Sequence, residues 1–342
     1  MKRTEIKELG EFGLIERLSQ KVTQYHPSTV KGIGDDAAVM DRGALLEVVS
    51  TDLLLEGVHF DLSFMPLHHL GYKAVAVNVS DIAAMNAQPQ QITVGLGLSN
   101  RMSVEAVDAL YAGIYKACEE YRVDLVGGDT TSSRSGLVLA ITALGQVERQ
   151  HICYRSGARK GDIICVTGDL GAAYLGLQVL LREKAEFQAN PDMKPQLERY
   201  GYVVERQLKP EARMDIVYDL REKGVVPTSM IDVSDGLASE LKHLAKHSGL
   251  GLDVYEDKLP IAQPALEVAA EFQLSSATCM LNGGEDYELA FTLNPNDYEK
   301  LKLHPDIHFI GVMREAENGA RLITKGEQVV PLLAQGWDHF GD

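Results

Sequence analysis

The chain has 342 residues, of which 45% are hydrophobic and 24% charged, and its formal net charge is −16. This composition excludes a disordered chain, and the length favours two domains. The negative charge argues against binding nucleic acid, which needs a cationic surface to displace counterions. The negative charge suits a protein that binds divalent cations, although many acidic enzymes bind none.

The cysteines and the N-terminus bear on the cellular compartment. Four cysteines are widely spaced and form no Cys-x-x-Cys pair, which favours free thiols over a disulfide framework or a zinc site. The N-terminal stretch MKRTEIKELGEF lacks the apolar core of a signal peptide, and no window reaches transmembrane length. We therefore expect a cytoplasmic protein that is not bound to a membrane.

The first half of the chain alternates predicted strands and helices. Strands are expected at 44–52, 91–98, 123–129 and 137–147, and helices at 71–87 and 103–121. The second helix is amphipathic, because apolar residues recur at helical spacing from Val104 to Cys118. A polar break near residue 149 predicts an N-terminal domain over residues 1–149.

The second half repeats this alternation and predicts a C-terminal α/β domain over residues 150–342. Its expected elements are a strand, glycine turn and helix over 163–180, helices at 211–224 and 235–247, and strands at 228–233, 287–293 and 307–312. Pro210 is expected to open the helix at 211–224, since proline suits a first helical turn. The chain therefore reads as a mixed α+β domain followed by an α/β domain.

Acidic residues stand beside Gly, Ser or Thr at six predicted element ends. These are Asp35 and Asp36 in GIGDDAAV, Asp52 in VSTDLLLEGVHF, Asp81 in VNVSD, Asp129 in LVGGDTT, Asp232 and Asp235 in IDVSDG, and Glu285 and Asp286 in LNGGEDYEL. Any one of them is more often a helix cap or a turn than a ligand. As a set they favour a site for Mg²⁺, which prefers oxygen ligands, with glycines that admit phosphate groups. Metal-assisted phosphoryl transfer is the chemistry that uses both.

Other features are weaker signals. The turn TGDLGAAYLG at 167–176 resembles a phosphate loop, but a tight strand-to-helix turn explains it equally well. The P-loop motif GxxxxGK[ST] is absent, as are the HRD and DFG motifs of protein kinases. His243 and His247 have metal-ligand spacing, yet without a third ligand they indicate a solvated helix face. VNVSDIAAM and IDVSDGLAS are similar enough to raise internal duplication as an alternative to chance.

Taken in order, the motifs resemble those of the thiamine-monophosphate kinase family, which belongs with the aminoimidazole ribonucleotide synthetases and selenophosphate synthetases. The matching stretches are EFGLI, GIGDDAAV, STDLLLEGVHF, GYKAVAVNVSDIAAM, LVGGDTT, RSGARKGD, VTGDLGAAYLGL, IDVSDGL, LNGGEDYEL and GWDHF. Each motif alone is weak, whereas their order and joint presence are specific. The resemblance implies an aminoimidazole ribonucleotide synthetase-like two-domain fold, with a homodimer that closes a barrel between its N-terminal domains.

The resemblance also implies a reaction and a set of site residues. ATP would phosphorylate thiamine monophosphate to thiamine diphosphate, with several Mg²⁺ ions and without a covalent nucleophile or a general base. The metal ligands would be Asp36, Ser50, Thr51, Asp52, Asp81, Asp129 and Asp232, with Asp235 holding a further ion. Nucleotide contacts would come from Tyr111, Gly127, Gly128, Asp129, Arg155 and Ser234, and substrate contacts from His59, Glu285 and Trp337.

Two alternatives remain at this point. The first is another ATP-using synthetase of the same family. A selenophosphate synthetase is expected to carry an N-terminal catalytic cysteine, whereas the first cysteine here is Cys118. A hydrogenase maturation factor is expected to end in a cysteine, whereas this chain ends in HFGD. The second alternative is a nucleotide or metal sensor without turnover, against which the retained carboxylates argue.

Overall fold

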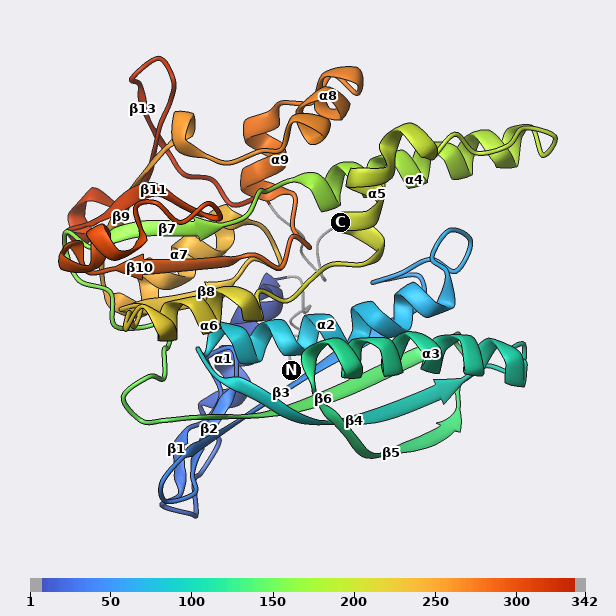
Figure 1. Cartoon of the computed structure of the whole chain (residues 1–342), viewed down its shortest axis with the longest axis horizontal. Coiled ribbons are helices and arrows are strands. Elements are labelled where there is room, and N and C mark those ends of the chain that lie inside the picture. The colour runs from blue at the N-terminus through green and yellow to red at the C-terminus, as the bar shows by residue number, and fades with distance from the viewer. Residues whose placement is uncertain (1–7, 336–342) are drawn as a thin grey trace.

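The computed structural model describes residues 8–335 and contains two β-sheets, one in each half of the chain (Figure 1). The first sheet has six strands in the order β1-β2-β3-β6-β4-β5, and the second has seven in the order β13-β12-β9-β11-β7-β10-β8. Helices lie against both sheets, which confirms the predicted mixed α/β character. No helix within residues 8–335 is long and apolar enough to span a membrane.

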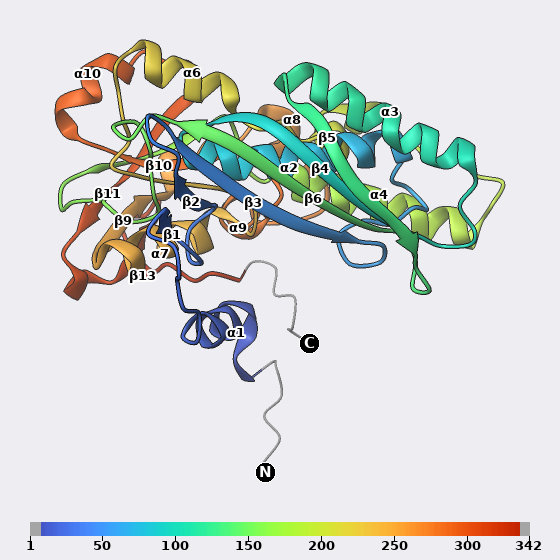
Figure 2. The ribbon, with the colours of Figure 1, turned by 90° about the horizontal axis from the view of Figure 1, so that it is seen from below.

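The N-terminal sheet has one covered and one open face. Its strands are β1 (Thr29–Lys31), β2 (Ala38–Asp41), β3 (Leu46–Leu55), β4 (Gln88–Leu98), β5 (Asp124–Ser132) and β6 (Val138–Val147). Helices α2 (Leu67–Ala84) and α3 (Val104–Tyr121) lie on one face, while Figure 2 shows β3, β6, β4 and β5 from the other. Along β3, Leu46 and Val48 are buried against the helices, whereas Leu53 on the open face is 59% exposed. Alternation along a strand separates the two faces.

The second sheet lies in the C-terminal half. Its strands are β7 (Ile163–Thr167), β8 (Ser229–Asp232), β9 (Gly251–Tyr255), β10 (Leu289–Leu293), β11 (Ile307–Arg314), β12 (Ala320–Ile323) and β13 (Val329–Pro331). The remaining helices are α1 (Gly10–Ser19), α4 (Ala172–Ala189), α5 (Gly201–Leu208), α6 (Met214–Glu222), α7 (Leu237–Ser248), α8 (Gln263–Glu271), α9 (Ser276–Asn282) and α10 (Tyr298–Leu301). Strand β10 is buried along its whole length, so the core of this half lies around it.

Several helix boundaries differ from the sequence prediction, as in α2, which was expected over 71–87, and in α6. Helix α6 begins at Met214, so Pro210 precedes the helix and does not occupy its first turn. The segment between them is held by tertiary contacts instead. The Ala212 N–H donates to the Tyr121 hydroxyl at 2.9 Å, and the Arg213 guanidinium donates to Glu288 at 2.6 Å. These contacts hold residues 211–213 outside the helix, where local sequence favours a helix.

The predicted division of the chain at residue 149 stays a prediction. Strand β6 ends at Val147 and β7 begins at Ile163, and the segment between them contains no helix or strand.

Helix α2 lies between the six-stranded sheet and the C-terminal half of the molecule (Figure 1). Nearly every residue from Leu70 to Ala84 is buried, and the helix contacts β3 and β6 on one side and β8, α5 and α6 on another. Glycines allow its close approach to α3. A Cβ at Gly71 would lie 2.0 Å from the Leu110 carbonyl oxygen, and one at Gly113 would lie 1.8 Å from that of His68.

We expect Gly113→Ala to lower the free energy of unfolding by about 1–3 kcal/mol or more, because a methyl group there overlaps backbone that cannot move aside. Gly201→Ala is the matched control, since nothing lies within 4 Å of its added Cβ and alanine favours the helix. Thermal and urea denaturation of both variants measure the difference. Equal stability of the two variants would contradict the proposed close packing of α2 and α3.

Candidate functional site

Three carboxylates from distant parts of the chain meet at the boundary between the two halves. Asp36 precedes β2, Asp81 lies on α2, and Asp232 ends β8. One oxygen from each lies within 4.8 Å of the others. The structure therefore brings together three of the predicted metal ligands, two from the N-terminal half and one from the C-terminal half.

Hydrogen bonds fix the orientation of each carboxylate. The Ser50 hydroxyl donates to Asp81 at 2.5 Å, and the Ser80 hydroxyl donates to Asp232 at 2.7 Å. Arg155 donates through two nitrogens to Oδ1 of Asp36, at 2.6 and 3.1 Å. The other oxygen of Asp36, Oδ2, is buried and accepts no hydrogen bond. A buried oxygen without a donor is a position where a cation can bind.

The electrostatics of the cluster also favour a cation. Burial raises the pKa of Asp36 to about 7, against the lowering effect of Arg155. Burial likewise raises the pKa of Asp52 and of Asp232 to about 6. The pKa of Asp81 is raised well above its ordinary value, first by burial and then by the charges of Asp52, Asp232 and Asp36. Hard oxygen donors that repel one another in this way fit Mg²⁺, which would neutralise their charges.

The alternation of side chains along β3 determines which of its predicted ligands face this cluster. Ser50 and Asp52 share one face of the strand, since residues two apart point the same way. Thr51 lies on the open face, where its hydroxyl donates to the Ile141 carbonyl oxygen at 3.0 Å. The structure therefore brings the side chains of Ser50 and Asp52 to the cluster, and places the Thr51 side chain on the opposite face.

A separate hollow contains four of the residues predicted to contact a nucleotide. It has a volume of about 510 Å³ and is lined in part by Tyr111, Gly127, Gly128 and Asp129. It lies along β5, which is separated from β3 by β6 and β4. Three strand spacings amount to roughly 14 Å. Within one chain, Asp129 is therefore not brought to the three clustered carboxylates.

The loop after β8 pairs with the segment before β10. The Glu285 N–H donates to the Ser234 carbonyl oxygen at 2.7 Å, which brings these two predicted contact residues together. Gly236 begins α7 with φ of 122°, and a Cβ there would lie 3.0 Å from the Leu281 carbonyl oxygen. Asp235 lies in the same turn, with its N–H donating to Glu240 at 3.1 Å, and is not a member of the three-carboxylate cluster.

Three residues at this site were not predicted from the sequence. Lys73 is 1% exposed on α2, and its ammonium lies 2.7 Å from Glu285. Gln207 donates to the other oxygen of Glu285, also at 2.7 Å. Glu240 is buried, and burial followed by the charges of Asp235 and Asp232 raises its pKa well above the ordinary value. A lysine in the apolar helix GYKAVAV was the available signal, because a buried lysine requires an anionic partner.

The other predicted residues lie as follows. His59 occupies the turn after β3, where its Nδ1 accepts from the Leu55 N–H at 3.0 Å. Trp337 lies outside the residues that the structure describes. The His243 ring packs on Phe12 at 4.4 Å, and across residues 8–335 neither His243 nor His247 joins a group of three metal-ligating side chains.

The glycine turn at 167–176 is filled by a carboxylate of the protein. Oxygens of Asp286 accept from the N–H groups of Gly171 and Ala173, at 2.7 and 3.3 Å, at the start of α4. These N–H groups are the ones that would otherwise bind an anion at a helix N-terminus. The structure therefore favours the strand-to-helix turn over a phosphate loop.

Comparison with known proteins agrees with this architecture. The model of the AIR synthase related protein N-terminal domain matches residues 34–147, and that of the C-terminal domain matches residues 159–320. Together these matches cover most of the chain. It therefore belongs to the AIR synthase related proteins, and the predicted fold class is confirmed.

The relatives define the branch of that family. Thiamine-monophosphate kinase of Bacillus subtilis is 35% identical over 341 residues, covering 97% of this chain and 100% of its own. That of Aquifex aeolicus is 33% identical, covering 98% and 99%. A solved structure of AaThiL complexed with AMPPCP and TMP has a TM-score of 0.83 and 31% identity, covering 99% of this chain and 100% of its own. The chain belongs to the thiamine-monophosphate kinase family, as its motifs predict.

We expect Ser80→Ala to lower the free energy of unfolding by about 1–3 kcal/mol, because it removes the hydroxyl that donates to the buried Asp232 carboxylate. The control is Ser19→Ala, whose hydroxyl donates to the Glu16 carbonyl oxygen at the protein surface and whose loss changes stability by about 0.5 kcal/mol or less. Denaturation in a metal-free buffer compares the two. A Ser80→Ala variant as stable as Ser19→Ala would contradict a stabilising contact between the domains.

Proposed function

We infer that the protein transfers the γ-phosphoryl group of ATP to thiamine monophosphate, which yields thiamine diphosphate and ADP. The observation that carries this inference is the meeting of Asp36, Asp81 and Asp232 beside Arg155, in a chain that matches thiamine-monophosphate kinases over its full length. The related AaThiL was solved with AMPPCP, an ATP analogue, and TMP. These relatives favour the kinase over another synthetase of the family or a sensor without turnover.

The chemistry needs positioning and charge neutralisation more than proton transfer. The accepting group is a phosphate, which is already ionised near neutral pH, so no side chain has to act as general base or covalent nucleophile. The main obstacle is repulsion between two phosphate-bearing anions. Arg155 supplies a fixed positive charge beside the cluster, and the carboxylates would hold cations there.

We propose that these cations are several Mg²⁺ ions. Asp36, Ser50, Asp52, Asp81 and Asp232 would hold them, Thr51 would take part through its backbone carbonyl, and Asp235 would hold a further ion. The support is the buried unpaired oxygen of Asp36 and the mutual repulsion of the carboxylates. When bound, Mg²⁺ would neutralise phosphate charge and orient the transferring group.

The nucleotide and the substrate are proposed to bind on either side of this junction. Tyr111, Gly127, Gly128 and Asp129 would contact the nucleotide along the hollow beside β5, together with Arg155 and Ser234. His59, Glu285 and Trp337 would contact thiamine monophosphate. Because Glu285 is already paired with Lys73 and Gln207, we expect it to accept hydrogen bonds from the substrate more than to act as an unpaired counter-charge.

A homodimer is proposed as the functional form. Strand β5 is an edge strand whose residues are almost all exposed, and the open face of the sheet carries Leu53 and Val126, each 59% exposed. Edge strands and apolar sheet faces are normally covered. A second copy of this chain would cover both, and would allow Asp129 to contribute to a site formed by two subunits.

The cytoplasm is the proposed location. Cys118, Cys153, Cys165 and Cys279 are all free thiols in the structure. Free thiols are typical of a reducing compartment.

The direct test is ADP formation with and without thiamine monophosphate. We expect turnover that requires thiamine monophosphate and Mg²⁺. Asp52→Asn should lower kcat by about a hundredfold or more while leaving the melting temperature unchanged or higher, because it removes a proposed ligand and a repelling charge but no volume. Nucleotide binding without substrate-dependent turnover would reject the kinase function. Wild-type turnover of Asp52→Asn at saturating Mg²⁺ would reject the role of that residue.

The homodimer is tested by placing a charge on the open sheet face. We expect Leu53→Glu to convert a dimer to a monomer in size-exclusion chromatography with light scattering, because a carboxylate cannot be buried unpaired in an apolar interface. Leu303→Glu is the control, since Leu303 is 88% exposed in the C-terminal half. A monomeric wild-type protein, or a Leu53→Glu variant that stays dimeric, would contradict the proposed interface.

A further inference from the structure

The segment from Gly284 to Glu288, here called the GEDYE strip, has an unusual backbone. Gly284, Glu285 and Tyr287 have φ values of 72°, 57° and 51°. A left-handed conformation in a residue other than glycine costs about 1–3 kcal/mol and persists only where the surroundings enforce it. The N–H groups of Glu285 and Tyr287 donate to the carbonyl oxygens of Ser234 and Val233, so the strip also holds the loop that follows Asp232.

The odd-numbered residues of the strip are linked to the proposed site. Glu285 is held by Lys73 and Gln207. Burial raises the pKa of Tyr287, and the charges of Glu285, Asp52 and Asp232 raise it further. These side-chain contacts alone do not explain the left-handed backbone. The peptide unit between Asp286 and Tyr287 is held at its N–H by the Val233 carbonyl oxygen, and its own carbonyl oxygen has a separate donor.

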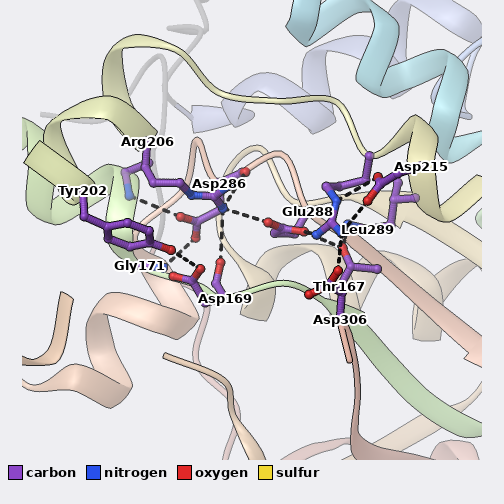
Figure 3. Close-up of polar contacts among 12 residues, drawn as sticks. Thr167, Asp169, Gly171, Tyr202, Arg206, Asp215, Asp286, Glu288, Leu289 and Asp306 are labelled. Carbon is purple, nitrogen blue, oxygen red and sulfur yellow. Dashed lines mark hydrogen bonds and ion pairs between the residues drawn. The ribbon is translucent and has the colours of Figure 1, made fainter. Parts of the chain in front are cut away.

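The even-numbered side chains lie in a buried polar network (Figure 3). Asp286 accepts from the N–H groups that begin α4. Glu288 is 1% exposed, and its carboxylate accepts from Arg206 at 2.8 Å, from Arg213 at 2.6 Å and from the Thr167 hydroxyl at 2.6 Å. Two arginines thus neutralise the same buried carboxylate.

The two arginines differ in one contact. The terminal nitrogen of Arg206 that contacts Glu288 also donates to the backbone carbonyl oxygens of Asp286 and Asp169, each at 3.3 Å (Figure 3). The Asp286 carbonyl belongs to the peptide unit that enters the left-handed Tyr287. Arg213 instead makes its remaining side-chain contacts with Asp215 and Asp306. Of these two arginines, only Arg206 donates to the strained backbone in the described part of the chain.

The position of Arg206 in α5 adds a second link to the strip. The next residue in the helix is Gln207, whose side chain donates to Glu285 and whose carbonyl oxygen accepts from Lys73. Consecutive residues of α5 thus contact both sides of the strip. The end of this helix fixes the backbone through Arg206 and the Glu285 carboxylate through Gln207.

We propose that Arg206 is a positioning residue for thiamine monophosphate: by holding the peptide unit after Asp286, it maintains the left-handed conformation that directs Glu285 toward the substrate. This inference rests on the proposed function, because it assumes that Glu285 contacts thiamine monophosphate. Arg206 itself does not contact the substrate.

The test compares Arg206→Gln with the matched variant Arg213→Gln, since each removes one of the two arginines that bind Glu288. We expect Arg206→Gln to raise the KM for thiamine monophosphate about tenfold and that for ATP by less than about threefold. Arg213→Gln should change neither KM by more than about twofold. Equal effects of the two variants on the KM for thiamine monophosphate would overturn the proposal.

Amide hydrogen exchange gives a readout that does not depend on catalysis. The N–H groups of Glu285 and Tyr287 should exchange faster in Arg206→Gln than in the wild type, and at the wild-type rate in Arg213→Gln. Unchanged exchange in Arg206→Gln would overturn the positioning role. A wild-type protein without turnover of thiamine monophosphate would instead reject the proposed function, so the two failures are distinct.

A second variant covers the case in which Arg206→Gln does not fold. Arg206→Lys retains the positive charge beside Glu288. Its shorter side chain cannot donate to all three oxygens that the arginine contacts. We expect a rise of about threefold in the KM for thiamine monophosphate and faster exchange at Tyr287. Wild-type values of both would overturn the proposal.

Discussion

The fold has to hold several buried carboxylates together, against their mutual repulsion, at one point between its two halves. Asp36, Asp81 and Asp232 place oxygens within 4.8 Å of one another, and the charge of Asp52 acts on the same group. Such an arrangement destabilises the protein unless its backbone is fixed from several sides. The burial of α2, which carries Asp81 and is packed against both sheets, provides that fixation. The proposed ligand site therefore lies beside a helix that is buried along most of its length.

Several of the contacts that join the two halves use residues of the proposed site. Ser80 contacts Asp232, Lys73 contacts Glu285, and Arg155 contacts Asp36. Each pair places a carboxylate proposed to contact metal or substrate opposite a donor from another segment. Binding at this site and the relative position of the halves are therefore linked, since a ligand that takes one of these oxygens competes with a contact between them.

Local patterns in the sequence predicted much of the fold and part of the site. Across the described residues, periodicity located most of the strands and five of the ten α-helices. The repeated pattern of acidic and small residues identified the three carboxylates that meet. The side-chain direction of Thr51 depends on the register of β3, because a shift of one residue moves every side chain to the other face of the sheet. The separation of Asp129 depends on the strand order β3-β6-β4-β5, and the pairing of Lys73 depends on packing between halves. The local sequence specifies neither this strand order nor the packing between the halves.

The Asp286 carboxylate at the start of α4 has a consequence for nucleotide selection. With the N–H groups of that helix already occupied, its dipole is not available to phosphate oxygens. The junction that remains carries Asp36, Asp52, Asp81 and Asp232 near the single guanidinium of Arg155. At the proposed site, such a surplus of negative charge would repel a bare triphosphate and would accept one whose charge is masked by a chelated cation. The fold would thus distinguish metal-complexed from free nucleotide by electrostatics alone, before any contact with the base or the sugar.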